Sequence, residues 1–275
     1  MRVRAQTLGK EEPTYPDNED AFRLATDTPA WAVADGAGGG GIYAGEWANH
    51  LANHVPTEPF ANFSAFSAWL DRIWEPFYET YGQQATPDAL KLNKFLSEGS
   101  YATLATLHLA DNHAHWTTYG DAVALTWHRK TGLRSSVADL RAFASAPHLL
   151  NWNTNPLLNG FRTGQWPHRR DQRYALLSDT LAQYVLMAHD TLIGPSDALL
   201  TLAREPTALG NRAATHLAHW QPRHHFGRDV WAPLARALRS RPAFMAYTRN
   251  RVAQNLLGPD DYTMVLIDGL VLNLF

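Results

Sequence analysis

The chain contains no cysteine among its 275 residues. This absence excludes disulfides, thiolate metal sites and a cysteine nucleophile, and with the last it excludes the chemistry of tyrosine phosphatases. The formal net charge is only −2, so no basic field favours nucleic acid or an anionic membrane. No run approaches the roughly 18–20 apolar residues of a membrane span, and the first residues lack a signal peptide's apolar segment. These absences predict a cytoplasmic protein that binds neither nucleic acid nor membrane.

What is present indicates a globular chain. Hydrophobic residues make up 45% and charged residues 18% of the sequence, enough to bury a core without staples. We see no internal repeat and no clear linker, so residues 1–275 are expected to form one domain.

Short β-rich runs alternate irregularly with longer helical patterns. The predicted strands are Val3–Thr7, Ala21–Ala25, Trp31–Ala34, Tyr101–Leu109, His115–Tyr119, Ala122–His128, Leu133–Leu140, Tyr174–Leu177 and Thr263–Ile267. The predicted helices are Ala44–His54, Phe63–Tyr81, Leu181–His189, Asp197–Arg204, Val230–Arg239 and Phe244–Leu257. Residues Ala146–Arg173 and Trp220–Arg228 are expected to be irregular loops. Hairpin strands with helices inserted between them favour an α+β fold of antiparallel sheets with helices outside.

Four groups of acids stand at the ends of predicted core strands. They are Asn18-Glu19-Asp20 before a strand, Asp35-Gly36 after one, Ser178-Asp179 after another, and Gly258-Pro259-Asp260-Asp261 before the last. Burying such carboxylates is costly without a cation, and oxygen ligands suit Mg²⁺ or Mn²⁺. The glycines after Asp35 allow a sharp turn, but no Lys-Ser/Thr ending follows, so a P-loop is rejected.

Seven segments in this order resemble motifs of the metal-dependent protein phosphatases, the type 2C serine/threonine family, in a divergent bacterial form. The matching segments are Asn18-Glu19-Asp20, Ala34-Asp35-Gly36 with its glycines, Ala44-Gly45-Glu46, Gly99-Ser100-Tyr101-Ala102-Thr103, Gly120-Asp121-Ala122, Ser178-Asp179-Thr180 and, at the end, Gly258-Pro259-Asp260-Asp261-Tyr262-Thr263. The resemblance spans nearly the whole chain. It implies a four-layer α-β-β-α sandwich of two antiparallel sheets flanked by helices.

The resemblance also implies a centre of two Mg²⁺ or Mn²⁺ ions, with a third ion in some members. Asp35 would bridge two ions, and the Gly36 carbonyl would bind one. Asp179 and Asp260 would complete one ion's protein ligands, and Glu19 would serve the other. The remaining positions are Asp20, which would hold metal-bound water, and Asp121, associated with the third ion.

The implied activity is hydrolysis of phosphate monoesters on serine and threonine of proteins. A water that bridges the metals would attack phosphorus in line, so Asp35 and Asp20 are the expected catalytic residues. The expected partners are a phosphorylated protein and a cognate serine/threonine kinase, and a monomer is expected.

Several substrate contacts of the family are missing. Tyr15 stands where many members have a phosphate-binding arginine, and a tyrosine lacks the bidentate fork. Candidate replacements are Lys10, Arg162, Arg169, Arg170 and Arg223. Thr180 replaces a glycine, Ala122 a serine and Ala37 a histidine.

Two alternatives to a protein phosphatase stay open on the sequence. One is a catalytically weak pseudophosphatase that acts as a regulatory binding module, and the other is a phosphatase of small molecules. Thirteen histidines show no metalloprotease spacing, although His224 or His225 could donate a proton to a leaving group.

Overall fold

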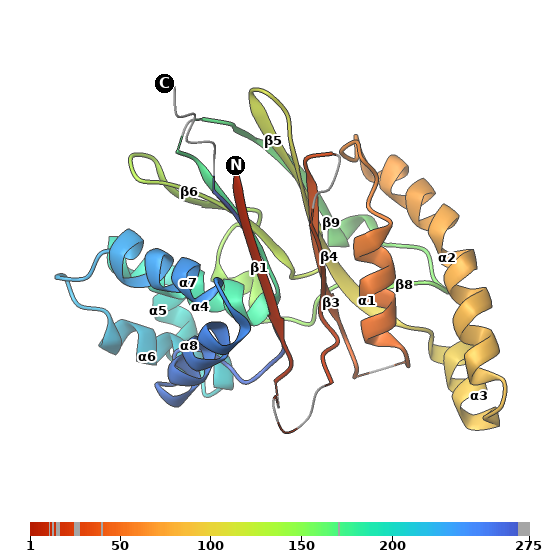
Figure 1. The fold of residues 1–275 in the computed structure, drawn as a ribbon. Coiled ribbons are helices and arrows are strands. Elements are labelled where there is room, and N and C mark those ends of the chain that lie inside the picture. Colours follow the sequence, from red (N-terminus) through yellow and green to blue (C-terminus); the bar gives the residue numbers. More distant parts are fainter. Residues whose placement is uncertain are drawn as a thin grey trace.

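The computed structural model describes residues 1–268 apart from 11, 13, 15, 16, 25–27, 40 and 170. Two antiparallel sheets lie face to face between two layers of helices (Figure 1). This arrangement confirms the predicted α+β fold, the four-layer α-β-β-α sandwich. That all of residues 1–275 form a single domain stays a prediction.

One sheet, called sheet A, has the strand order β1-β11-β10-β6-β7. Its strands are β1 (Arg2–Leu8), β6 (Val123–His128), β7 (Gly132–Ser135), β10 (Arg173–Leu177) and β11 (Tyr262–Asp268). The helices on its outer face are α4 (Asp179–Ile193), α5 (Asp197–Leu202), α6 (Ala208–His219), α7 (Ala232–Ala237) and α8 (Arg241–Ala253), with a π-helical segment, Phe226–Trp231, leading into α7.

The other sheet, sheet B, has the order β2-β3-β4-β5-β9, and β8 pairs with β4. Its strands are β2 (Ala21–Arg23), β3 (Ala30–Gly36), β4 (Tyr101–Leu109), β5 (His113–Tyr119), β8 (Leu150–Asn151) and β9 (Phe161–Pro167). The helices α1 (Ala44–Asn53), α2 (Phe63–Ala85) and α3 (Ala89–Glu98) form the layer on its side.

Strand β3 shows why both faces of sheet B are apolar. Its side chains alternate between the two faces, as in any strand. Trp31 and Val33 enter the core between the sheets, whereas Ala32 and Ala34 pack under α1 and α2. The small alanines let helix α1 lie close to the strand. Because both faces of the strand are buried, its sequence is a continuous apolar run.

The structure corrects the sequence prediction in the irregular segments. The predicted strand Leu133–Leu140 ends at Ser135, and a 3₁₀ turn, Leu140–Phe143, follows later. The expected loop Ala146–Arg173 contains β8 and β9, and the expected loop Trp220–Arg228 runs into the π-helical segment. Strand β9 is mostly exposed at the sheet edge, so it carries no apolar alternation to detect.

Helices α3 and α6 were missed for a related reason. Helix α3 buries only Phe95, and α6 buries Gly210, Ala213 and His216. Their apolar faces are therefore short and only partly buried, with Leu92 of α3 and Leu209 and Leu217 of α6 packed at the edge of the core. Within the described part of the chain, no helix combines the length and apolar content needed to cross a membrane.

Candidate functional site

Two of the predicted acids stand together at one end of sheet B. Asp35 is the last residue but one of β3, and Asp20 directly precedes β2. These strands pair antiparallel through Ala21 opposite Ala34, and the Gly36 N–H donates to the Glu19 carbonyl at 3.1 Å. A side chain at Gly36 has no room, because a Cβ there would lie 2.5 Å from that same carbonyl oxygen.

Two further acids stand at the facing end of sheet A. Asp179 opens α4 directly after β10, and Asp260 lies two residues before β11. The two strands are neighbours, and their ends are joined by Ser178 and Thr263. The Ser178 N–H donates to the Thr263 carbonyl at 3.0 Å, and the Thr263 N–H donates to Ser178 Oγ at 3.0 Å.

Asp121 lies in the short connection from β5 to β6, where the chain passes from sheet B to sheet A. Gly120 makes the turn with a φ of +82°, a conformation that favours glycine. Burial, with the neighbouring charge of Asp179, raises the pKa of Asp121 to about 7.

Electrostatics show that these five aspartates form one cluster. Burial raises the pKa of Asp35 well above its ordinary value, and the charges of Asp20, Asp179, Asp121 and Asp260 raise it further, in that order. The pKa of Asp179 is raised to about 6, first by burial and then by Asp260. Like charges gathered in a poorly solvated place oppose ionisation. The cluster thus draws acids from both sheets, and the role of these acids as metal ligands stays a prediction.

Asp20 shows that the cluster suits a cation. Its side chain is buried, and neither carboxylate oxygen has a hydrogen-bond partner among the described residues. Burial raises its pKa to about 8, while the nearby side chains of Thr263, Asp35 and Ser178, none of which reaches good hydrogen-bond geometry, act in the opposite direction. An ionised carboxylate in this position is unfavourable without a compensating cation or water. Since the donors here are carboxylate oxygens, they fit Mg²⁺ or Mn²⁺.

The cluster is nevertheless not closed around a common point. Within the described residues, no three carboxylate or imidazole side chains form a group that could hold a metal ion. Two aspartates use their oxygens on protein donors instead. Asp179 accepts from the Thr180 N–H and from Gln183 Nε2 at 3.1 Å, and Asp260 accepts from Thr180 Oγ1 at 3.1 Å. Thr180, the residue that replaces the family's glycine, thus links the two acids of sheet A.

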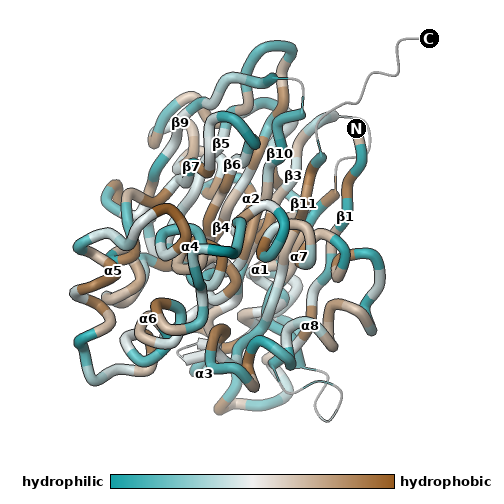
Figure 2. Tube along the Cα trace, turned by 90° about the vertical axis from the view of Figure 1, so that its left-hand side faces the viewer, coloured by the Kyte–Doolittle hydropathy of each residue, from teal (hydrophilic) through white to brown (hydrophobic). Residues whose placement is uncertain are grey.

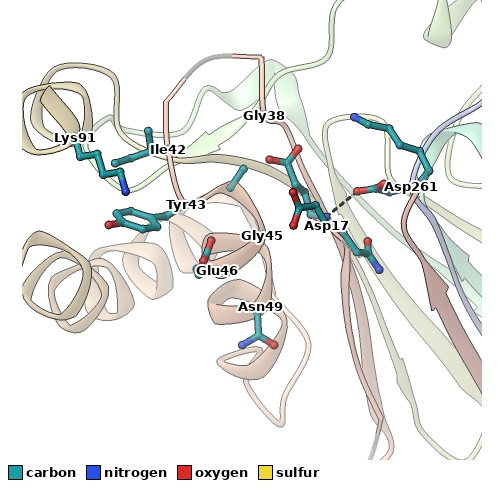
Figure 3. Close-up of a pocket in the computed structure, with 13 residues that line it drawn as sticks. Asp17, Gly38, Ile42, Tyr43, Gly45, Glu46, Asn49, Lys91 and Asp261 are labelled. Atoms are coloured by element: carbon teal, nitrogen blue, oxygen red, sulfur yellow. Dashed lines mark hydrogen bonds between the residues drawn. The ribbon is translucent and has the colours of Figure 1, made fainter. Parts of the chain in front are cut away.

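The main charges that act on Glu19 come from Asp261, Lys10 and Glu46 and not from the five aspartates. The Glu19 carboxylate rests against the backbone of Gly38, where an added Cβ would overlap both oxygens. Burial raises its pKa, Asp261 raises it further, and Lys10 acts in the opposite direction. Glu19 also lines a groove of about 830 Å³ (Figure 3). This groove runs from Lys10 and Asp261 past the start of α1 to Lys91 on α3.

Asp261 is a residue of the site whose role the sequence did not reveal. It is buried, and its two oxygens accept backbone N–H groups of Glu19 at 2.7 Å and Lys10 at 2.8 Å (Figure 3). This carboxylate fixes the Glu19 segment to the start of β11. The sequence signal for Asp261 was its place as the second acid of the Asp260-Asp261 pair, directly before a buried strand.

Arg212 is a second residue near the site that the sequence did not reveal. It donates to Gln183 Oε1 at 3.0 Å and lies near Asp179, without any sequence motif.

The structure separates the candidate phosphate-binding cations. The charge of Lys10 lowers the pKa of Glu19, and the charge of Arg162 lowers that of Asp121. Arg162 Nη1 also donates to the Gly120 carbonyl at 3.1 Å. In the described part of the chain, neither Arg169 nor Arg223 is among the charges that shift these carboxylates. Tyr15 and Arg170 lie outside the described residues, as does Ala25 of the predicted second strand.

The predicted proton donors belong to another part of the molecule. His224 Nδ1 accepts the Gln221 N–H at 2.9 Å and its ring packs edge-on against Trp220. The His225 N–H donates to Asp229. Both histidines thus stabilise the turn between α6 and the π-helical segment.

No model of a protein family and no curated protein matches the sequence. Solved bacterial structures do match the fold. PppA, a key regulatory component of T6SS in Pseudomonas aeruginosa, shares 16% identity over 98% of this chain and 97% of its own, with a TM-score of 0.53. The serine/threonine phosphatase Stp1 from Staphylococcus aureus shares 13% identity over 98% and 96%, with a TM-score of 0.51. The chain therefore has the fold of the type 2C phosphatases, and the resemblance predicted from its motifs is confirmed at the level of the fold.

Proposed function

We propose that this chain is a metal-dependent phosphatase that hydrolyses phosphate monoesters on serine and threonine of proteins. The observation that carries the proposal is the cluster of five aspartates from both sheets, one of them with two buried oxygens and no partner among the described residues. The shared fold with Stp1 supports it. A phosphorylated protein and the kinase that modifies it are the proposed partners, and the cytoplasm is the proposed location.

The oxygen donors of these residues are of the type that Mg²⁺ and Mn²⁺ prefer, although the described side chains are not gathered around one point. Asp35, Asp179 and Asp260 are the proposed ligands of one ion, and Glu19 and the Gly36 carbonyl those of the second, with Asp35 shared. Asp121 is the proposed ligand of a third ion. When bound, Mg²⁺ or Mn²⁺ would lower the pKa of water and offset charge on the phosphoryl oxygens.

The protein's own side chains have separate proposed tasks. The Asp20 oxygens, which have no described partner, accept hydrogen bonds from water and orient it. Lys10 and Arg162 bind the substrate phosphate in place of the family's arginine, since each lies beside a predicted ligand. The groove beside Glu19 receives the peptide that carries the phosphate.

Hydrolysis of p-nitrophenyl phosphate by the purified protein with Mn²⁺ tests the proposal. We expect turnover that chelation abolishes and that Asp35→Asn reduces to background. The matched control is Asp71→Asn, an exposed position on α2, which should retain full activity. Turnover that is absent, or that survives Asp35→Asn, would contradict the enzyme.

A pseudophosphatase is the second candidate, and the hydrogen bonds of Thr180 and Gln183 to Asp179 and Asp260 favour it. In that case these acids serve the fold and a partner is bound without turnover. Calorimetry with Mn²⁺ separates the two. Two sites that are lost in Asp35→Asn and Asp260→Asn support the enzyme, whereas the absence of Mn²⁺ binding supports the module.

A further inference from the structure

One row of side chains on the outer face of sheet A extends beyond the helices that cover this face. Arg2 pairs with Asp268, Asp268 with Arg173, and Arg173 with Trp127, across four neighbouring strands. Directly paired residues of antiparallel strands point to the same face. In both views the β1 and β6 ends of the sheet project past the helix layer (Figures 1 and 2).

The neighbouring row shows where helix coverage stops. Its members Leu266, Ala175 and Leu125 belong to the core under the helices. Its remaining member, Arg4, donates from Nη1 to the Ala235 carbonyl of α7 at 3.0 Å. In the row from Arg2 to Trp127 the helical layer reaches only Trp127, which packs against Phe226 and Trp231 of the π-helical segment. The other three members, Arg2, Asp268 and Arg173, line the floor of a groove beyond the helices, and Trp127 closes one side of it.

The groove has a volume of about 820 Å³ and is strongly basic. Its cations are Arg2, Arg4, Arg129, Lys130 and Arg173, and its acids are Asp171 and Asp268. Five positive against two negative charges give a local surplus of +3, in a chain whose net charge is −2. The surplus is thus a feature of this groove and not of the composition.

The arginines on the floor are only partly neutralised. One carboxylate, that of Asp268, is shared by Arg4 at 3.2 Å and Arg173 at 3.5 Å. The Arg173 guanidinium also lies over the Trp127 ring, 5.1 Å from its centroid. Burial lowers the pKa of Arg4, and Arg2, Arg239 and Arg173 lower it further against the effect of Asp268. Guanidinium groups held against one another in this way favour an added carboxylate, which their planar donors bind in pairs.

We propose that this basic groove binds an acidic peptide segment of a partner protein. Its cations come from β1, β10 and the β6–β7 turn, so they suit an extended chain with several carboxylates more than a single small anion. Asp171 and Asp268 disfavour the uniform charge of a nucleic acid backbone. Among the residues that line the groove, Met1 is the exposed large apolar side chain, which gives little for a membrane surface to hold. The proposal does not depend on phosphatase activity.

Fluorescence anisotropy with a labelled oligoglutamate peptide tests this site on the full-length protein. We expect binding that weakens as the salt concentration rises, and no binding of a matched oligoglutamine peptide. The double substitution Arg129→Glu with Lys130→Glu should weaken binding by about tenfold or more, because both residues are exposed on the rim. The matched control is Arg72→Glu with Arg204→Glu, which makes the same charge change at exposed positions outside the groove.

The outcomes decide the proposal in either direction. Loss of peptide binding in the groove variant, with binding retained in the control, supports it. Absence of peptide binding, or an equal loss in both variants, overturns it. Tighter binding of a single-stranded oligonucleotide or of phosphatidylserine vesicles than of the peptide also overturns it. The melting temperature of each variant, measured alongside, identifies any loss that comes from unfolding.

Discussion

At the scale of single residues, His216 of α6 has a protonation state that its contacts define. The side chain is fully buried, and its Nε2 lies 2.8 Å from the Leu256 carbonyl, which can only accept. Nε2 therefore carries the proton, and Nδ1 accepts the Trp220 Nε1–H at 3.1 Å. A second proton on Nδ1 would face that donor in a dry environment, and burial lowers the pKa of His216 from 6.5 to about 4.

This depressed pKa predicts a loss of stability in acid. Because the folded pKa lies below the unfolded one, the contribution of His216 is complete above about pH 6.5 and is lost as the pH falls toward about 4. The free energy of unfolding should fall by about 2 kcal/mol from His216 alone between about pH 7 and about pH 5. Urea denaturation at both pH values measures it. In His216→Gln the free energy of unfolding should depend less steeply on pH than in the wild type. The control His113→Gln, at an exposed position, should keep the wild-type dependence. Equal slopes for His216→Gln and the wild type would refute the assignment.

At the scale of elements, the glycine loop after β3 predicts a sharp contrast between neighbours. A Cβ at Gly38 would overlap both Glu19 oxygens, whereas a Cβ at Gly39 would meet nothing within 4 Å. Gly38→Ala should therefore displace the Glu19 carboxylate and weaken Mn²⁺ binding by about tenfold or more, while Gly39→Ala should bind normally. Calorimetric titration of the two variants compares them. The same affinity in both would mean that Glu19 is not a ligand.

The elements also show what the sequence could and could not predict. Strands buried on both faces, such as β3 and β4, were predicted closely because their apolar runs are continuous. Edge strand β9 and helix α3 were missed because most of their side chains are exposed. The aspartates and Glu19 were singled out as candidate site residues because a carboxylate at the end of an apolar strand is unusual. The sequence could not show which of these acids interact most strongly. In the structure the main charges that act on Glu19 are Asp261 and Lys10, whereas those that act on Asp35 are the other four aspartates.

At the scale of the whole molecule, the aspartate cluster joins the facing ends of the two sheets. Asp20 and Asp35 belong to sheet B, Asp179 and Asp260 to sheet A, and Asp121 to the crossing between them. Their mutual repulsion acts across the interface that forms the centre of the sandwich. A cation bound there should therefore stabilise the entire fold and not only a local loop.

Thermal unfolding with and without Mn²⁺ tests this coupling. At roughly 100-fold excess over its dissociation constant, a bound ion adds about 3 kcal/mol, which for a chain of this size raises the melting temperature by roughly 5–10 °C. Asp35→Asn removes the carboxylate on which the other four act, so the metal-free variant should melt a few degrees above the wild type. The same variant should lose the increment from Mn²⁺, and Asp71→Asn should show neither effect. A metal-free Asp35→Asn protein that melts lower, or one that keeps the Mn²⁺ increment, would show that repulsion at this interface does not limit the stability of the sandwich.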